Sequence, residues 1–258
     1  TCDTRIFYGR VVACADRGGH GKANSTYILL KKTTKLVSNP EIPRWQLQGR
    51  TTFMQITIYR GTKEIGGTLI EVKTATTRIL IDAGYPLFLN NEPIDDKIAK
   101  LPHTELLRFG VLPKIDGLYD WDAPDFNAVL VSHAHIDHYG LLTYINSVIP
   151  VYTSAGTDRL IQVSQRFKIC DSFDLEVRGF KMYQPFQIGD IEIKPYLMDH
   201  SAFDAAAFEI SAEGKTVIYS GDFRGHGRKA VCLDRFIEIA KKQADILLIE
   251  GSVLGRPD

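Results

Sequence analysis

The stretch that decides the fold is Ser132-His133-Ala134-His135-Ile136-Asp137-His138. It follows the apolar run at residues 128–131, which predicts a short buried strand. Imidazole nitrogens and carboxylate oxygens are ligands that zinc takes readily. Alternate side chains of an extended loop point the same way, so the first two histidines can face one metal while Asp137 and His138 turn towards a neighbouring point. The motif therefore predicts a two-metal site, whose ions in hydrolases lie about 3.5–4 Å apart.

Three further polar residues stand where predicted strands end. His200 follows the predicted strand 191–197, Asp222 follows 216–220, and Asp82 closes a third strand. Any one of them alone could be an ordinary capped loop residue, but together with the histidine motif they complete a ligand set. For Asp82 we expect an indirect role, because a carboxylate that accepts the N–H of a ligand histidine fixes its tautomer and ring direction.

In this order, these residues resemble the first four motifs of metallo-β-lactamase-fold hydrolases, and the resemblance covers about Met54 to Asp258. It implies two divalent ions, zinc with manganese as the alternative. It also implies residue roles: one metal would be bound by His133, His135 and His200, the other by Asp137 and His138, with Asp222 bridging them. The catalytic carboxylates would be Asp137, Asp222 and Asp82. The family has a further histidine ligand, for which no candidate follows His226.

The resemblance also implies the fold, an αββα sandwich of the mixed α/β class, incomplete at the C-terminus. Alternating apolar residues from Met54 onwards agree with strands, and 156–167 and 234–242 suit helices. A further helix is expected at about 140–147. Residues 84–127, punctuated by Pro, Asn and Asp, predict a long insertion beside a site rather than core.

Residues 1–53 differ from the rest of the chain. They carry nine Lys and Arg against three acidic residues, whereas the whole chain has no net charge, and they show no sustained period. We expect a disordered or non-native leader, with a basic RNA-binding arm as the alternative. Residues 54–258 are expected to be the N-terminal part of a metallo-β-lactamase-fold domain, truncated near the start of a β-CASP insertion.

Composition narrows the class of protein. The four cysteines are scattered without a Cys-x-x-Cys pair, which argues against a zinc knuckle and favours reduced thiols in a cytoplasmic protein. No apolar run is long enough to span a membrane, so we expect no membrane partner. A homo-oligomer is compatible with the sequence but not specified by it.

Two features resemble the RNA-processing β-CASP branch, which includes the ribonuclease J family. Residues 246–252 are similar to the strand and acidic residue, Glu250, at which a β-CASP domain begins, although Glu250 could simply end a core strand. Residues 60–67, 199–201 and 220–223 are similar to ribonuclease J-type sequences. The basic loop after Asp222 offers Arg224 and Arg228 for substrate phosphates, or is a solvated turn.

Three hypotheses of function remain open from the sequence. The first is a phosphodiester-cleaving ribonuclease that uses a water activated by two metals, with RNA as substrate. The second is a small-molecule hydrolase of the same fold, acting on a lactone, thioester or β-lactam. The third is a catalytically inert fragment.

Overall fold

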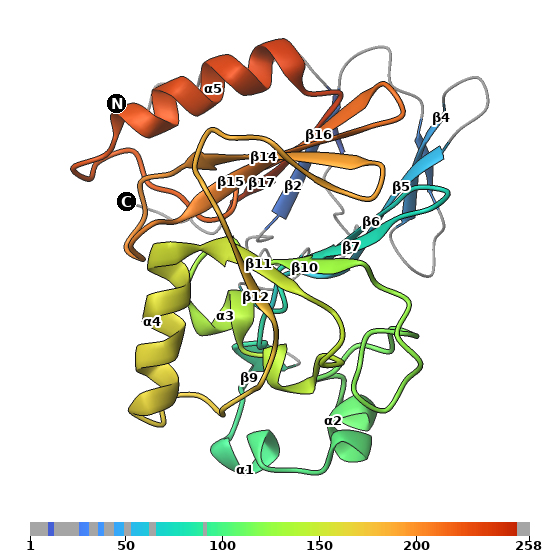
Figure 1. Cartoon of the computed structure of the whole chain (residues 1–258), viewed down its shortest axis with the longest axis vertical. Helices are drawn as coiled ribbons and strands as arrows, with labels where there is room; N and C mark the ends of the chain where they lie inside the picture. Colours follow the sequence, from blue (N-terminus) through green and yellow to red (C-terminus); the bar gives the residue numbers. More distant parts are fainter. Residues whose placement is uncertain are drawn as a thin grey trace.

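A computed structural model describes residues 53–61, 66–89 and 92–251 and, nearer the N-terminus, the backbone of the segments 10–12, 26–30, 36–38 and 44–48. Two β-sheets pack against each other, and helices cover their outer faces: α5 lies over one sheet, and α1 to α4 lie beyond the other (Figure 1). This layering confirms the predicted α/β fold class.

The larger sheet has eight strands and mixed direction. Its β7, β10, β11 and β12 are parallel, and the strands from β7 to β3 are antiparallel hairpin neighbours. In spatial order the strands are β12 (Val177–Phe180), β11 (Val151–Ser154), β10 (Ala128–Leu130), β7 (Arg78–Ile81), β6 (Leu69–Lys73), β5 (Phe53–Arg60), β4 (Arg44–Gln48) and β3 (Leu36–Ser38).

The second sheet has seven strands, and a two-stranded ribbon stands apart from both sheets. In spatial order the seven are β1 (Arg10–Val12), β2 (Thr26–Leu30), β17 (Ile246–Glu250), β16 (Lys215–Tyr219), β15 (Ala206–Ala212), β14 (Ile191–Leu197) and β13 (Phe186–Ile188). The ribbon pairs β8 (Phe88–Leu89) with β9 (Glu92–Pro93).

Side chains of a strand alternate between its two faces. Those that point between the two sheets form the main core. In β7, Ile79 and Ile81 join the cluster between the sheets, whereas Leu80 joins the cluster on the outer face. In β17, Ile246 and Leu248 point inwards in the same way. Both faces of these strands are therefore apolar, which explains the short, fully apolar runs in the sequence.

The expectation for residues 84–127 was wrong in one respect. Helices α1 (Asp96–Ala99) and α2 (His103–Phe109) lie in this segment, and Leu106, Leu118 and Tyr119 are fully buried in the outer cluster. The segment is thus a second core layer over the larger sheet. Its apolar residues are spaced irregularly, which is why the sequence pattern suggested an insertion.

The helix expected at about 140–147 was also misplaced. Helix α3 (Ile136–Tyr139) begins inside the histidine motif and ends at Gly140, and only a 3-10 turn, η1 (Leu142–Tyr144), follows. The apolar residues that suggested a helix are buried, but the backbone turns to an extended conformation at Ile145 and bridges to Tyr119. Tertiary packing overrides the local pattern here.

Two longer helices flank the sandwich. Helix α4 (Ala155–Arg166) starts at Ser154, whose hydroxyl accepts the Thr157 N–H as an N-cap. Helix α5 (Val231–Gln243) buries Phe236 and Ala240 against the seven-stranded sheet. Among the described residues, no helix is both long and apolar enough to cross a membrane.

The prediction of a disordered or non-native leader falls mostly on residues outside the described ranges, so it stays a prediction. Within residues 1–53 the backbone of four strand segments is described. Strand β2 runs antiparallel to β17, and β4 runs antiparallel to β5.

Candidate metal centre

The candidate site lies where four strands of the two sheets end. Strands β7 and β10 are parallel neighbours, so Asp82 and the histidine motif leave the same edge of the larger sheet. Strands β14 and β16 lead to His200 and Asp222 on the other sheet. The two edges are joined by the Ala206 N–H, which donates to the Ser132 carbonyl at 2.9 Å.

Four histidine rings converge at this edge. His135 Nδ1 lies 3.1 Å from His133 Nε2 and 3.0 Å from His200 Nε2. The ligand atoms of His133, His135 and His200 form one group, and those of His133, His138 and Asp222 form another, each within 4.8 Å. In tetrahedral zinc sites, Zn–N bonds of about 2.0–2.1 Å place neighbouring nitrogens about 3.3 Å apart. The nitrogen spacing of the first group therefore suits one such ion.

Asp222 faces both groups. Its Oδ1 lies 3.4 Å from His138 Nε2, and its Oδ2 lies 3.9 Å from His200 Nε2 and 4.0 Å from His133 Nε2. This is the position that a bridging carboxylate requires. Asp137 Oδ2 lies 3.8 Å from His138 Nε2, outside both groups. The structure thus brings together all six residues predicted as ligands.

Asp82 holds this arrangement in place through hydrogen bonds. It is fully buried with φ 57°, a left-handed conformation that Asp tolerates better than most residues. Its Oδ2 accepts from His138 Nδ1 and from the Tyr219 hydroxyl, both at 2.7 Å. With Nδ1–H bound to Asp82, the Nε2 of His138 points towards Asp222. The indirect role predicted for Asp82 matches this geometry.

Ser132 extends the same anchor to a second ring. Its hydroxyl donates to Asp82 Oδ2 at 2.8 Å and lies 3.0 Å from His133 Nδ1. Since the hydroxyl proton goes to Asp82, the serine oxygen accepts the His133 Nδ1–H and leaves Nε2 bare. The sequence analysis assigned no role to Ser132. Its place directly before His133 was the only available signal.

Backbone contacts hold helix α3 against the loop after β7. The Ala83 N–H donates to the His138 carbonyl at 2.8 Å, and the Thr68 N–H donates to the Asp137 carbonyl at 3.1 Å. Glycine is required at position 84, because a Cβ there would lie 1.8 Å from the Asp137 carbonyl oxygen. Contacts with the segments around Thr68 and Ala83 therefore hold the motif in place, and not the short helix α3 itself.

The electrostatics of the cluster favour neutral rings at His133 and His200 and a protonated ring at His138. Burial, reinforced by neighbouring rings, lowers the pKa of His133 well below its usual range. Burial also lowers the pKa of His200 to about 4, against the opposing charge of Asp222. For His138, burial opposes a charge, but the carboxylates of Asp222 and Asp82 outweigh it and raise the pKa well above its usual range.

Asp222 shows the same balance from the acidic side. Burial alone would raise its pKa, yet the nearby rings of His138, His200 and His135 lower it below the usual value. A carboxylate and ring nitrogens turned towards one another, in a buried site, are a donor set that a divalent cation fits.

The two arginines predicted to hold substrate differ from each other. Arg224 is tied to Asp199, a buried residue: its Nε lies 3.3 Å from Asp199 Oδ1, and its backbone N–H donates to the Asp199 carbonyl at 2.7 Å. Arg228 is exposed on the same loop. Glu250, singled out in the sequence, accepts the Phe223 N–H at 3.1 Å and so braces the loop that carries Asp222.

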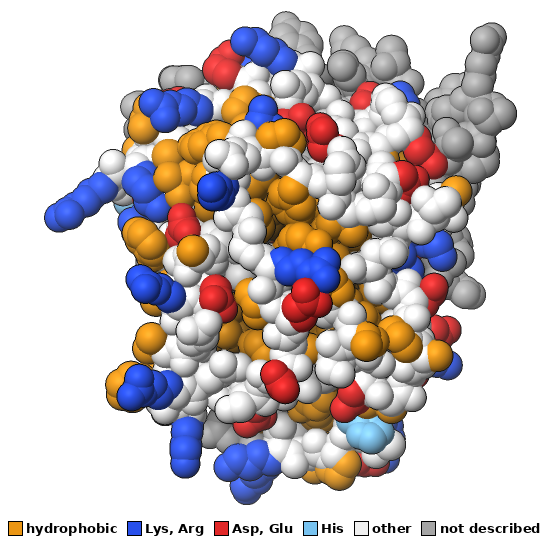
Figure 2. All heavy atoms as spheres, in the orientation of Figure 1, with side chains coloured by type: hydrophobic (Ala, Val, Ile, Leu, Met, Phe, Trp, Pro, Cys, Tyr) orange, Lys and Arg blue, Asp and Glu red, His pale blue; other side chains and the backbone are white. Residues whose placement is uncertain are grey.

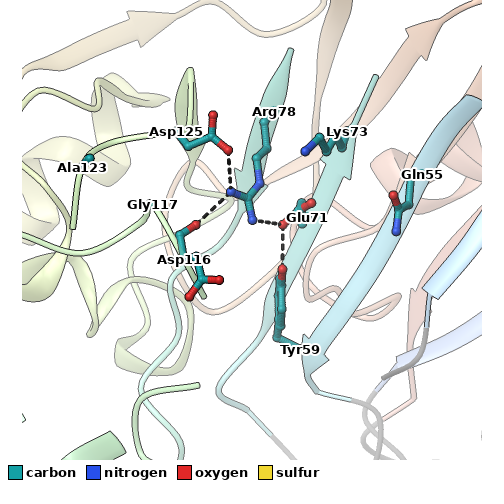
Figure 3. A pocket seen from close by; sticks show the side chains of 9 residues that line it. All are labelled: Gln55, Tyr59, Glu71, Lys73, Arg78, Asp116, Gly117, Ala123 and Asp125. Atoms are coloured by element: carbon teal, nitrogen blue, oxygen red, sulfur yellow. Dashed lines mark hydrogen bonds and ion pairs between the residues drawn. The ribbon is translucent and has the colours of Figure 1, made fainter. Parts of the chain in front are cut away.

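A second polar pocket, of about 410 Å³, lies at the opposite end of β7 (Figure 3). Arg78 occupies its centre. Its Nη2 donates to Glu71 at 2.8 Å, and its Nη1 donates to Asp125 at 3.1 Å and to the Asp116 carbonyl at 2.9 Å. The Tyr59 hydroxyl also donates to Glu71, at 2.7 Å. The Arg78 and Glu71 charges at the centre of this pocket thus each face an opposite charge and a further hydrogen-bonding group.

Comparison with known proteins adds family information. The family model described as "Beta-lactamase superfamily domain" matches residues 77–256. An "RNase J-like protein" of Methanocaldococcus jannaschii is 27% identical over 209 residues, which is 76% of this chain and 42% of that protein. "Ribonuclease J" of Helicobacter pylori is 27% identical over 183 residues, 66% of this chain and 23% of that protein. The chain spans less than half the length of either relative.

A solved structure agrees with the fold. The crystal structure of a protein of unknown function from Enterococcus faecalis V583 matches with a TM-score of 0.66 and 27% identity, over 79% of this chain and 51% of that chain.

Proposed function

The chain belongs to the metallo-β-lactamase superfamily, and from this premise we propose that its His/Asp cluster holds two divalent metal ions and serves the hydrolysis of phosphodiester bonds in RNA. The observation that carries the proposal is the convergence of four histidine rings and Asp222 at one edge of the sandwich. The family fold implies divalent metals; zinc is the ion we propose, with manganese as the alternative.

The first proposed ligand set coincides with one group of converging side chains, and the second adds Asp137 to His138. His133, His135 and His200 would hold one ion, His138 and Asp137 the other, and Asp222 would stand between them. When bound, such ions supply Lewis acidity and lower the pKa of a water towards neutrality. Three histidine nitrogens and the Asp222 carboxylate would complete the ligands of the first ion.

The chain's own residues set the protonation of the site. Asp82 accepts the His138 Nδ1–H directly and the His133 Nδ1–H through Ser132, so the Nε2 atoms of both rings point into the site. His133 Nε2 is bare, whereas His138 releases its Nε2 proton when a metal binds. The anchor lies at the bottom of the site, where Asp82 and Ser132 are fully buried. Water therefore cannot compete for these hydrogen bonds, and the ring directions are fixed before any ligand binds.

RNA as the substrate is supported by two observations. Relatives named for ribonuclease J share 27% identity with this chain. The loop 224–229 beside Asp222 carries Arg228 in an exposed position, and Arg224 with its backbone held to Asp199. Arginine forks match phosphate oxygens, so this loop is where we propose that the RNA backbone binds. A cytoplasmic location, where scattered thiols stay reduced, is part of the same proposal.

The test compares three substrates on the full chain loaded with zinc or manganese. We expect cleavage of single-stranded RNA, abolished in His135→Ala, and no turnover of a chromogenic lactone or β-lactam. Turnover of the lactone or β-lactam without RNA cleavage would assign the site to small molecules instead. Absence of all hydrolysis in a chain that retains both metals would favour an inert domain.

The basic loop has its own measurement. Arg228→Ala should weaken RNA binding for all sequences and make the dependence of log affinity on log salt shallower by about one unit per lost phosphate contact. Metal content should not change, because Arg228 is not a candidate ligand. An unchanged salt slope would remove this loop from the proposed RNA path.

A further inference from the structure

Phe203 is an aromatic residue that the fold leaves in the open beside the metal centre. Its side chain is 67% exposed, although large apolar side chains are usually buried. It lies three positions after His200, and each residue of chain spans at most about 3.6 Å, so the two Cα atoms are no more than about 11 Å apart. Exposure this close to a candidate catalytic site calls for a functional explanation.

The backbone around Phe203 is fixed on both sides. On one side, Ser201 Oγ lies 3.4 Å from His135 Nε2, and His200 Nε2 lies 3.0 Å from His135 Nδ1. On the other side, Asp204, with φ 65°, accepts the Gly156 N–H at 3.0 Å through its carboxylate. The Ser154 hydroxyl donates to the Asp204 carbonyl, also at 3.0 Å. The ring is therefore carried by a short segment tied to the site at one end and to the start of α4 at the other.

The ring itself rests on the backbone of α4. A Cβ at Gly156 would lie 2.7 Å from Phe203 Cδ1 and 2.8 Å from Cε1, so glycine at this position lets the ring lie close against the helix. One part of the ring is supported by protein, and the exposed part faces outwards. The result is a rigid, flat apolar surface at the rim of the metal centre.

A basic loop lies next to this surface. Lys229 Nζ stands over the ring, 5.9 Å from its centroid, at the outer limit for a cation–π contact. Lys229 belongs to the loop 224–229, which also carries the exposed Arg228 and follows Asp222. On the face in Figure 2, apolar and basic side chains lie next to each other along the edge that carries α4. An aromatic platform beside cations is the combination that binds single-stranded nucleic acid.

We propose that Phe203 stacks a nucleobase of single-stranded RNA close to the bond that is cleaved. The proposal rests on the proposed function, because it assumes a phosphodiester at the metal centre. A stacked strand advances about 3.4 Å per nucleotide, so the ring lies within about three nucleotides of that phosphate. Stacking on an aromatic residue accepts every base, and so Phe203 would contribute affinity and position without selecting sequence.

A protein partner is the other macromolecule that could cover an exposed ring. The surroundings of Phe203 favour RNA, because Lys229 stands over the ring and the neighbouring residues Ser201 and Asp204 are polar. Interfaces between proteins are instead depleted of lysine at their centres.

The experiment measures binding of the full, zinc-loaded chain to a single-stranded phosphorothioate RNA by fluorescence anisotropy, beside cleavage of ordinary RNA. Phe203→Ala should weaken binding about 5- to 150-fold, the loss that corresponds to stacking of one base. Phe203→Trp should bind as wild type, and Phe203→Leu should resemble Phe203→Ala. Phe167→Ala is the matched control, because Phe167 is 72% exposed at the other end of α4.

An RNA with abasic sites separates stacking from other effects. On abasic RNA, wild type and Phe203→Ala should bind equally, and the salt dependence should not differ between them on either RNA. The inference is overturned if wild type cleaves RNA but Phe203→Ala binds as tightly, if Phe203→Leu binds like wild type, or if Phe203→Ala disrupts only association with protein. Failure of wild type to bind or cleave any RNA would instead reject the proposed function.

Discussion

Clusters of charged and polar residues lie at the two ends of β7, and they differ in how their charges are matched. Arg78 begins the strand and Asp82 follows its last residue, roughly 13 Å away at about 3.3 Å per residue. At the first end, one cation is matched by Glu71 and Asp125 and lies 3.9 Å above the Phe126 ring. At the second end, ring nitrogens and carboxylates face one another.

The difference indicates which cluster needs a ligand. For Arg78, burial would lower the pKa, but the contact with Glu71 prevails and raises it, so the protein supplies both partners of the pair. At the other end, His138 lies between two carboxylates that hold its pKa high, while His133 and His200 are held neutral. The second end thus sets two carboxylates, Asp82 and Asp222, against one charged ring, and the excess negative charge is held at a cost unless a cation compensates it. We therefore assign a structural role to the Arg78 end of β7 and metal binding to the histidine end.

The largest expected effect on stability belongs to the Arg78 end. Arg78→Met would leave Glu71, whose side chain is 5% exposed, as a buried carboxylate without its cation. Breaking a buried ion pair in this way costs about 3–5 kcal/mol. Chemical denaturation should show this loss, and metal content should be unchanged. The matched control is Arg178→Met, which breaks an exposed pair with Glu176 and should leave the midpoint of denaturation almost unchanged.

Removal of metal should lower stability only through the histidine cluster. A ligand at 100 times its dissociation constant stabilises the folded state by about 2.7 kcal/mol. Chelation should therefore lower the melting temperature of wild type and of Arg78→Met by similar amounts, and leave that of His135→Ala almost unchanged. Equal sensitivity of all three to the chelator would mean that the histidine cluster is not where the stabilising metal binds.

Asp82 should show an effect on the metal without direct contact. In Asp82→Asn the residue keeps its size but loses the charge that accepts from His138, Ser132 and Tyr219. Loss of such a partner typically reduces metal affinity about 10- to 100-fold. Competition with a chromogenic chelator measures the affinity. Wild-type affinity in this variant would show that ring orientation does not depend on Asp82.

The smallest effect is expected from the N-terminal segment. If residues 1–53 are a leader, deletion of residues 1–52 should change the melting temperature by no more than a few degrees, because this segment lacks core-forming periodicity. A larger fall would show that pairing of β2 with β17 and of β4 with β5 supports the sandwich. It would also make the leader prediction wrong.

The sequence predicted the site better than its surroundings. Ligand-type residues at the ends of apolar strands are local signals, and parallel pairing of β7 with β10 then brings Asp82 to the histidine motif. Core packing at residues 84–127 escaped prediction because Leu106, Leu118 and Tyr119 follow no period. The contact of Tyr219 escaped prediction, because nothing in the sequence places its hydroxyl against Asp82, which lies 137 residues away along the chain.

Long-range contacts also explain the misplaced helix. Leu141, Leu142 and Ile145 have helix-like spacing, yet they are buried in the outer cluster from a 3-10 turn. The length of α3 is limited by the loop after β7, whose Ala83 and Tyr85 N–H groups donate to the His138 and Ile136 carbonyls. Such constraints come from strands that are distant in sequence, and a local pattern cannot carry them.

The most direct test of the metal-centre assignment is elemental analysis of the purified full chain. Wild type should carry two equivalents of divalent metal, His135→Ala should lose at least one, and His103→Ala, in which an exposed histidine on α2 is removed, should lose none. Circular dichroism should show that all three proteins are folded. Unchanged metal content in a folded His135→Ala protein would contradict the assignment of the histidine cluster as the metal centre.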